Sequence, residues 1–377
     1  MRRFEPPQGH PARQGKPLIH YLAFHYGDQV HHHSHSGYQR LPQFIQTPWR
    51  LTASGPAVIH RWTAAAERFD AWRRLRKPFL ALGLIPGGWN LNLDREGLRA
   101  PEPIVHYLYG EQVYFLGGLR HRPGAVVTLH EVPTWVDRNL PRRWPKYLKN
   151  AARIIAMSSS QAAFLRSRAP EAAVEVVLHG IDTDYFAPVA AAREDFLLFT
   201  GGYLRDFKTF LAAMELLLAR RKDIRVVAVS PRKSVRQHEA AFHRLTERYS
   251  AHRFRLLSGI PDAQLLDLYQ KARLYVSPLI DCTANNGLLE AMSCGLPAVV
   301  SDVGGVRDYA LGDFVQPGNA PALADAVERL WNDEAALRRL GKAHRDRCVD
   351  LLDWRLVAPK MERLYADVLE QTPGGRR

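Results

Sequence analysis

The amino-acid sequence predicts an α/β protein with two doubly wound, Rossmann-like domains. Apolar runs of strand length alternate with segments of helical periodicity, which is typical of parallel sheets covered by helices. This alternation forms two sets, divided near residue 188. The chain has 377 residues, of which 46% are hydrophobic, so it is long enough for two cores. In folds of this class, ligands bind at the carboxyl ends of the strands.

Net charge and cysteine content indicate which partners and which cellular compartment to expect. The formal net charge of +14 favours anionic partners, either a nucleotide-sugar, a phospholipid surface or a nucleic acid. No nucleic-acid-binding motif accompanies the charge, so nucleic acid is not an expected partner. Three scattered cysteines, Cys282, Cys294 and Cys348, form no disulfide framework. With neither a signal peptide nor an apolar run long enough to span a bilayer, the sequence predicts a cytoplasmic protein.

The first predicted domain covers residues 18–187 and follows a Pro- and Gly-rich segment, residues 1–17, which we expect to be a disordered tail. Its strands are predicted at residues 18–24, 104–109, 125–129 and 154–158, with a helix over 59–72. A polar loop follows the first strand and leads through Ser36, Gly37 and Tyr38 into a helix. Because it leaves the carboxyl end of a strand, this loop is expected to face the active site.

The same loop contains four histidines, His31, His32, His33 and His35. Imidazole is a common metal ligand, so a metal site is one interpretation. Consecutive histidines point in different directions, however, and neither a cysteine partner nor HExxH spacing accompanies them. We therefore expect no bound metal, and a loop that forms hydrogen bonds near an anionic ligand.

A basic segment precedes the last strand of the first domain. Pro145 is expected at the first position of a helix that places Lys146, Lys149 and Arg153 on one face. Aromatic side chains lie among these cations, namely Trp135, Trp144 and Tyr147. Such a face suits peripheral association with an anionic membrane surface, although an ordinary solvated basic face gives the same pattern.

The second predicted domain covers residues 188–353. Its strands are predicted at residues 196–200, 224–230, 254–257, 274–276 and 298–301. The turn from Gly201 to Lys208 follows the first of these strands and opens a helix that runs through Leu218. A basic helix is expected over 235–249, and the final segment, residues 354–377, begins with a helix that ends at residue 369.

The stretch from residue 274 to residue 308 carries the clearest functional pattern. A strand ends at Ser277, and a polar loop leads through Asn285 and Asn286 to a helix-forming run from Leu288 to Ser293. The first amides of a helix have no acceptor within it, so a phosphate can dock against Gly287 and Leu288. We place Glu290 in the first turn of this helix. There it either stabilises the helix or accepts hydrogen bonds from ligand hydroxyls, and a loop of this kind alone can also be no more than a turn.

Several segments resemble the signature of retaining glycosyltransferase family four, the glycosyl transferases group 1, which has the GT-B fold. LLEAMSCGLP (residues 288–297) resembles its glutamate motif, and GGVRD (residues 304–308) its glycine turn. VVLHGIDTDYFAP (residues 176–188) is similar to its NGVDxxxFxP segment, and FVQPGNAPALADAVERL (residues 314–330) to a later helix. The resemblance runs from residue 176 to residue 369.

The resemblance implies two domains that face each other across a cleft, with the last helix crossing back to the first domain. Together with the helix and loop patterns above, it predicts donor binding by Gly37, Gly202, Arg205, Lys208, Asn285, Asn286, Gly287, Leu288 and Glu290, with the two asparagines expected to bind the sugar hydroxyls in place of the missing first glutamate. Glu290 matches the family's second glutamate, which binds the donor ribose, and Lys208 matches the lysine that neutralises the diphosphate. His130 matches a histidine that reaches the donor sugar, with His106 as the second candidate. His130, Lys208 and Glu290 are therefore the expected catalytic residues.

The chain departs from the family pattern at three positions. Cys282 stands where the first glutamate is usual, with Asp281 one place away, and His179 replaces an asparagine. Tyr203 replaces the usual arginine of the diphosphate turn, so we expect Arg205 to take over its role.

The implied function is transfer of a hexose from a nucleoside diphosphate sugar to a cell-envelope glycan or lipid-linked acceptor, with retention of the anomeric configuration. No metal or other cofactor is expected besides this donor. The alternatives are a catalytically inactive, sugar-nucleotide-binding protein and, from the charge, a protein that acts on or binds nucleic acid.

Overall fold

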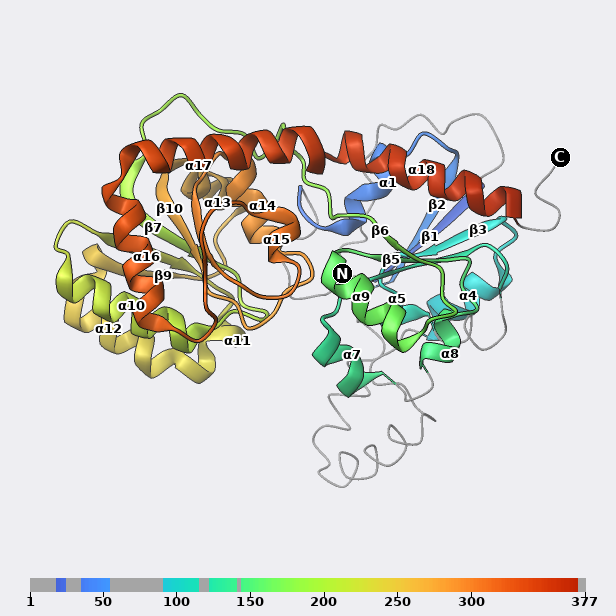
Figure 1. Cartoon of the computed structure of the whole chain (residues 1–377), viewed down its shortest axis with the longest axis horizontal. Coiled ribbons are helices and arrows are strands. Elements are labelled where there is room, and N and C mark those ends of the chain that lie inside the picture. Colours follow the sequence, from blue (N-terminus) through green and yellow to red (C-terminus); the bar gives the residue numbers. More distant parts are fainter. Residues whose placement is uncertain (1–17, 25–34, 55–90, 115–121, 141–143, 372–377) are drawn as a thin grey trace, which may run out of the picture.

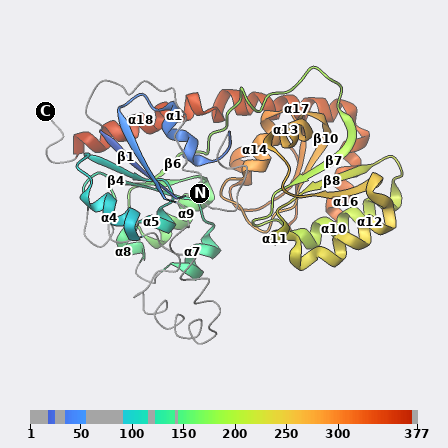
Figure 2. The ribbon, with the colours of Figure 1, turned by 180° about the vertical axis from the view of Figure 1, so that it is seen from behind.

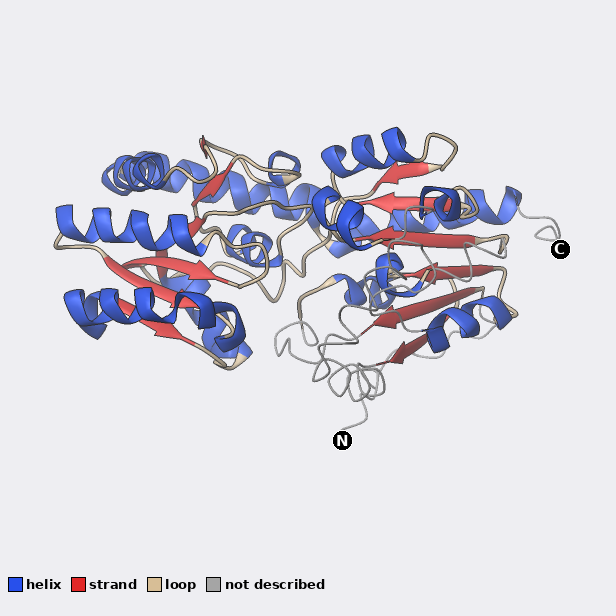
Figure 3. Cartoon of the chain, turned by 90° about the horizontal axis from the view of Figure 1, so that it is seen from below, coloured by secondary structure: helices blue, strands red, loops and turns tan. Residues whose placement is uncertain are grey.

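The fold is taken from a computed structural model of the whole chain, which describes residues 18–24, 35–54, 91–114, 122–140 and 144–371. The predicted tail over 1–17, the predicted helix over 59–72 and three of the loop histidines, His31, His32 and His33, lie outside these residues. The described strands form two six-stranded sheets, and every pairing between neighbouring strands is parallel. The predicted doubly wound α/β class is therefore confirmed, as Figures 1 and 3 show.

The first sheet has the strand order β2-β1-β3-β4-β5-β6. Its strands are β1 (Ile19–Phe24), β2 (Trp49–Ser54), β3 (Ile104–Tyr107), β4 (Ala125–Leu129), β5 (Arg153–Ala156) and β6 (Val174–Val176). The helices of this part are α1 (Leu41–Phe44), α4 (Leu91–Arg99), α5 (Gly110–Val113), α7 (Pro133–Asn139), α8 (Trp144–Leu148) and α9 (Ser159–Arg168), with a short 3-10 turn, η2 (Tyr38–Arg40), before α1.

The second sheet has the order β12-β11-β10-β7-β8-β9. Its strands are β7 (Glu194–Thr200), β8 (Arg225–Val229), β9 (Phe254–Leu257), β10 (Ala272–Ser277), β11 (Ala298–Ser301) and β12 (Phe314–Val315). Around it lie α10 (Phe207–Arg220), α11 (Arg232–Val235), α12 (Glu239–Arg253), α13 (Asp262–Lys271), α14 (Asn286–Ser293), α15 (Val306–Tyr309), α16 (Ala320–Asn332) and α17 (Glu334–Arg347). Two short turns, η3 (Arg236–His238) and η4 (Cys348–Leu352), complete it.

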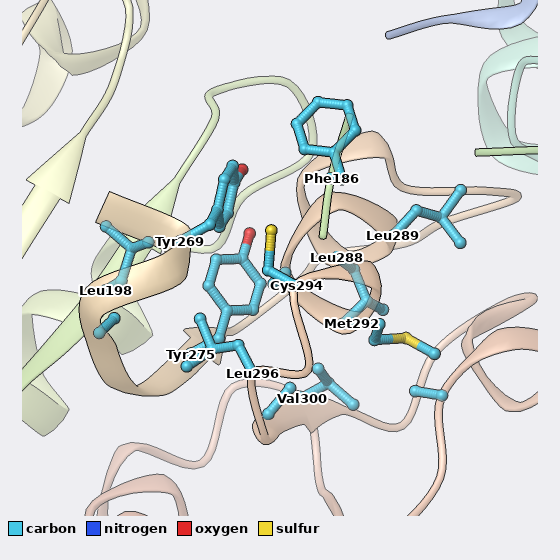
Figure 4. Close-up of a cluster of buried hydrophobic side chains, with 14 of the residues drawn as sticks. Phe186, Leu198, Tyr269, Tyr275, Leu288, Leu289, Met292, Cys294, Leu296 and Val300 are labelled. Carbon is cyan, nitrogen blue, oxygen red and sulfur yellow. The ribbon is translucent and has the colours of Figure 1, made fainter. Parts of the chain in front are cut away.

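Alternate residues of each central strand enter cores on opposite faces of the sheet. In β7, Leu198 packs in one core and Leu197 in the other. In β1, Leu22 and Tyr21 are divided in the same way. Strands covered on both faces are apolar throughout, which is why these strands were evident in the sequence. Figure 4 shows one of these cores, where Leu288 of α14 lies near Tyr269 and Tyr275.

The last helix, α18 (Trp354–Gln371), returns to the first sheet. Figures 1 and 2 show it running from the second domain along the first. Its buried side chains recur at helical spacing, namely Trp354, Val357, Ala358, Met361, Leu364, Tyr365 and Val368, and they share a core with β1. The hydroxyl of Tyr365 lies 2.7 Å from Nδ1 of His106 and accepts a 3.1 Å hydrogen bond from Tyr21. The C-terminal segment is thus part of the first domain's core, while the exact domain borders drawn from the sequence stay a prediction.

The predicted basic helix with three cations on one face is wrong. α8 ends at Leu148, and Arg153 is the first residue of β5, so Lys146 and Arg153 do not share a helix. Trp144 and Tyr147 are buried in the core of the first domain, so their rings are not on the surface among the cations. Lys149 forms a 3.0 Å ion pair with Glu171. Across the described ranges, no helix is both long and apolar enough to cross a membrane.

Candidate active site

The candidate site lies at the carboxyl ends of β7 and β10, where α10 and α14 begin. The loop after β7 contains two residues with positive φ, Gly201 at 97° and Leu204 at 56°. Asp206 caps α10 by accepting the amide of Thr209 at 2.9 Å. Lys208 is the second residue of α10, is exposed and forms no ion pair with the described residues. A cation therefore stands beside a helix N-terminus, at the edge where ligands bind in this fold.

Arg205 ties this loop to α14. Its Nε donates to the carbonyl of Thr200 at 2.8 Å, and its Nη2 donates to Oδ1 of Asn285 at 2.9 Å. A side chain at Gly201 would place Cβ 2.6 Å from Nη2 of Arg205, so only glycine permits this approach. The guanidinium consequently adds positive charge at the start of α14, where the dipole of the helix is also positive.

Asn285 is the N-cap of α14. Its Oδ1 accepts the amide of Leu288 at 3.1 Å, so the Leu288 amide, predicted to bind a phosphate, is used by the cap. Because of this cap the helix begins at Asn286, and Glu290 lies in its second turn. The prediction of Glu290 in the first turn is therefore wrong.

Gly287 has a packing role at this site. A Cβ there would lie 2.6 Å from Oγ1 of Thr200 and 2.9 Å from the hydroxyl of Tyr275. Thr200 Oγ1 is 2.8 Å from the hydroxyl of Tyr269 and 2.9 Å from that of Tyr275. Burial, and then the nearby charge of Glu290, raise the pKa of Tyr269. The glycine thus lets α14 approach a buried cluster of hydroxyls next to Glu290.

Glu290 is 5% exposed and meets the loop of the other domain. Its Oε1 accepts a hydrogen bond of 2.5 Å from the hydroxyl of Ser36, which is equally buried. The next residue, Gly37, has a φ of 97°. The structure thus brings together the glutamate and the loop after the first strand, which the sequence predicted to face one ligand.

His130 lies directly after β4, at the carboxyl edge of the first sheet. Its Nε2 donates to the carbonyl of Leu108 at 2.6 Å, and its ring stacks on Tyr109 with the centroids 4.4 Å apart. The carbonyl of His130 accepts a 2.5 Å hydrogen bond from the hydroxyl of Thr283, in the loop between β10 and α14. The imidazole is thus held at the strand end beside a loop of the second domain.

The second candidate, His106, is not a site residue. It is fully buried, and its two ring nitrogens lie 2.7 Å from the hydroxyls of Tyr365 and Thr128. Burial, and then the charge of His130, lower the pKa of His106 to about 3, so its ring is neutral. It belongs to the polar network beneath α18.

Further hydrogen bonds join the two domains. Tyr203, which stands where the family has an arginine, donates its hydroxyl to Glu131. The amide of Ser159 donates to Oδ2 of Asp308 at 2.7 Å, so a carboxylate of the glycine turn lies at the N-terminus of α9. The two domains thus meet at the loops that follow their strands.

Cys282 supplies no carboxylate in place of the missing first glutamate. It is buried, and burial raises the pKa of its thiol to about 12, so the thiol is neutral. Its carbonyl accepts the amide of Gly305 at 2.7 Å. Oδ1 of Asp281 accepts the amide of Cys282 at 2.7 Å, so the neighbouring acid caps its own loop.

Sequence reasoning missed Glu111, which is buried next to His130. Its Oε1 accepts the amide of His130 at 3.0 Å. Burial, and then the charge of Glu131, raise the pKa of Glu111 to about 8. Nothing in its local sequence differs from an ordinary helix start, so this role depends on the fold.

This raised pKa predicts a pH dependence of stability. The folded chain keeps a proton on Glu111 that the unfolded chain releases near pH ~4.3, so stability falls as pH rises from there to about 8. Glu111→Gln keeps the neutral shape and removes this titration. Urea unfolding should show the variant gaining stability relative to the native chain between about pH 5 and about pH 9. Glu175→Gln, at an exposed position of β6, is the control, and an equal gain there would contradict the assignment.

The comparisons with known proteins agree with this geometry. The glycosyl transferases group 1 family matches residues 194–333, from β7 to α16. The second domain thus resembles a group 1 glycosyltransferase domain. The fold of the whole chain is similar to sucrose-phosphate synthase from Thermosynechococcus elongatus, with a TM-score of 0.69 at 18% identity, covering 93% of this chain and 100% of the other. It is also similar to HepE of Anabaena in complex with UDP-glucose, with a TM-score of 0.67 at 12% identity and coverages of 92% and 99%. The GT-B prediction is therefore confirmed.

Curated relatives match over shorter spans. A D-inositol 3-phosphate glycosyltransferase from Corynebacterium aurimucosum is 28% identical over 218 residues, which are 52% of this chain and 52% of the relative. An alpha-maltose-1-phosphate synthase from Mycobacterium tuberculosis is 26% identical, over 63% of this chain and 67% of the relative. The chain thus spans about half to two thirds of the length of these two relatives.

Proposed function

We propose that the chain is a retaining hexosyltransferase that uses a nucleoside diphosphate sugar. The observation that carries the proposal is the position of Glu290, on α14 and at the cleft, within the matched group 1 domain. A buried carboxylate at this place is suited to accept hydrogen bonds from the ribose hydroxyls of a donor.

The surrounding charges suit a diphosphate. Arg205 covers the start of α14, and Lys208 stands at the start of α10. Negative charge develops on the leaving diphosphate as the sugar bond breaks, and fixed cations and helix N-termini stabilise it. The leaving phosphate can accept the proton of the acceptor hydroxyl on the same face of the sugar, and this step requires no protein side chain as base. His130 is the group of the first domain that we place beside the donor sugar.

For the acceptor we propose only a class, namely a cell-envelope glycan or a lipid-linked acceptor. The names of the relatives describe transfer to or synthesis of small sugar and inositol phosphates, and HepE was solved with UDP-glucose. Incubation of the purified chain with UDP-, GDP- and ADP-linked hexoses, with cell-envelope extract as acceptor, tests the proposal. Release of nucleoside diphosphate that depends on the extract supports it, and no release from any donor contradicts it.

One observation favours a second candidate, a sugar-nucleotide-binding protein without catalysis. Cys282 is a buried neutral thiol, and Asp281 is used by its own loop, so the first acid of the family pattern has no substitute here. The diphosphate and ribose groups do not depend on this position. Donor binding without any release in the same assay would favour this candidate.

The cation at α10 gives a direct prediction. Lys208→Ala should weaken binding of a nucleoside diphosphate by about 1.5 to 3 kcal/mol, the scale of a hydrogen bond to a charged group, and leave stability unchanged because Lys208 is exposed. Calorimetric titration and thermal unfolding measure the two effects. Lys222→Ala, at another exposed lysine, is the control. Native affinity in the Lys208 variant would remove this residue from the site.

Peripheral association with an anionic membrane surface stays a proposal, which now rests on the net charge of +14 because the predicted basic helical face does not form. Cations near an anionic leaflet contribute about 1 kcal/mol each and are screened by salt. Flotation should therefore recover the chain with anionic vesicles at low salt and lose it at high salt. Equal recovery with neutral vesicles would count against the proposal.

A further inference from the structure

Two consecutive residues of the first domain, His35 and Ser36, make different contacts at the edge of the second domain. The ring of His35 stacks on the ring of Tyr185, with centroids 3.5 Å apart and an angle of 4° between the planes. The hydroxyl of Ser36 donates to Glu290 at 2.5 Å. One residue thus presents a flat aromatic ring, and the next presents a hydroxyl to a carboxylate.

Tyr185 and Glu290, which contact His35 and Ser36, are held in place by further contacts. Oδ1 of Asp182 accepts the amide of Tyr185 at 3.1 Å, and Oδ2 of the same carboxylate accepts Nη2 of Arg40 at 2.6 Å. The ring of Tyr185 also packs edge-on against Phe186 at 4.9 Å. Glu290 is held by the helix α14. Tyr185 and Glu290 are therefore each held in place by their own surroundings.

Tyr185 and Glu290 lie close to each other. Burial raises the pKa of Tyr185, and the charges of Asp262, Glu290 and Asp182 add to this effect. Burial, and then the guanidinium of Arg40, lower the pKa of His35, so its ring is neutral at pH 7. A flat ring stacked on Tyr185 and a hydroxyl bonded to Glu290 are the kinds of contact that the base and the ribose of a nucleoside could make.

We propose that Tyr185 is the stacking surface for the donor's nucleobase, and that His35 and Ser36 occupy the nucleoside site until a donor displaces them. The inference rests on the proposed function, since it takes Glu290 as the ribose-binding carboxylate. Stacking on a tyrosine ring does not distinguish one nucleobase from another. The expected class of ligand is therefore a nucleoside diphosphate or a nucleoside diphosphate sugar, with the base left open.

Displacement of a bound segment lowers the apparent affinity for a ligand. Only the fraction of molecules in which His35 and Ser36 have left the site can bind, and the apparent dissociation constant rises in inverse proportion to that fraction. Removing both side chains is therefore expected to tighten binding. The hydrogen bond and the stacked pair hold the two residues in the site, and the conformational entropy that His35 and Ser36 regain on leaving offsets part of these contacts, so we expect a net change of roughly 5- to 30-fold.

The test compares the native chain with the double variant His35→Ala, Ser36→Ala by calorimetric titration with UDP, GDP and ADP. We expect at least one nucleoside diphosphate to bind the double variant roughly 5- to 30-fold more tightly, while inorganic pyrophosphate, which has neither base nor ribose, binds both alike. Tyr185→Leu should weaken nucleoside diphosphate binding and leave pyrophosphate binding unchanged. Tyr185→Phe, which keeps the ring, should restore most of the affinity, and thermal unfolding confirms that each variant is folded.

The outcomes distinguish failure of this inference from failure of the proposed function. If the native chain binds a nucleoside diphosphate and the double variant binds it equally or more weakly, His35 and Ser36 do not block the site, and the inference is wrong while the proposed function stands. Unchanged affinity in Tyr185→Leu likewise overturns the stacking surface alone. If neither the native chain nor the double variant binds any of the three nucleotides, the proposed function fails and the inference fails with it.

Discussion

Replacing Trp354 with alanine is expected to lower the free energy of unfolding by about 3 to 5 kcal/mol, the usual cost of truncating a large buried aromatic side chain. Trp354 is 1% exposed and begins α18, the helix that returns to the first sheet. Its ring packs edge-on against Tyr38 at 5.7 Å and lies 5.3 Å from the ring of His179. A Cβ at Gly180 would come within 2.3 Å of the indole, so the backbone is packed directly against it.

Urea unfolding of the variant measures this effect. The matched control is Leu356→Ala, in the same helix, because Leu356 is 41% exposed and should cost less than about 0.5 kcal/mol. Similar losses in the two variants would show that the indole does not anchor α18. A large loss of stability in the Trp354 variant alone would show that α18 and the segment after β1, which contains Tyr38, stabilise one core.

The sequence predicted the central strands and one edge strand, β9, but it missed the other three edge strands, for a physical reason. β4 and β11 have the predicted bounds because both faces of these strands are covered, which requires continuous apolar residues. β2, β6 and β12 were missed. They lie at the edges of the sheets, are partly exposed, and β6 and β12 have only three and two residues. Such strands leave little periodic signal in the sequence.

The candidate site was predictable where one local segment builds it. The loop from Asn285 and the helix that carries Glu290 follow from short-range patterns of capping and periodicity. The contacts of Ser36 with Glu290 and of Thr283 with His130 join residues 254 and 153 positions apart in the sequence. No local pattern encodes such pairs, because they depend on how the two domains face each other.

The basic segment shows how a correct periodicity can mislead. Lys146, Lys149 and Arg153 have helical spacing, but spacing gives one face only while the helix continues. Arg153 opens β5, whose pairing with β4 and β6 determines the backbone there. Tertiary pairing overrode the local preference, and the side chain of Arg153 donates instead to the neighbouring carbonyl of Ala152 at 2.7 Å.

Glu290→Ala is expected to weaken nucleoside diphosphate binding, because the ribose hydroxyls lose a charged acceptor. Such a hydrogen bond contributes about 1.5 to 3 kcal/mol, which is a factor of roughly 10 to 150 in affinity. In the free chain the same carboxylate accepts the hydroxyl of Ser36, so the native protein gives up that bond when the donor binds. The variant has no such bond to lose, and we therefore expect a change near the lower end, about tenfold.

Glu290→Gln separates charge from shape at this buried position. An amide oxygen still accepts one hydrogen bond, and the side chain fills the same volume beside Tyr269, so the variant should keep its stability and lose less affinity than the alanine variant. Titration calorimetry of both variants with UDP, GDP and ADP gives the order native, Gln, Ala if the carboxylate binds the ribose. Inorganic pyrophosphate should bind all three alike, because it has no ribose. Equal nucleoside diphosphate affinity in the folded alanine variant would mean that Glu290 only stabilises the packing between the two domains.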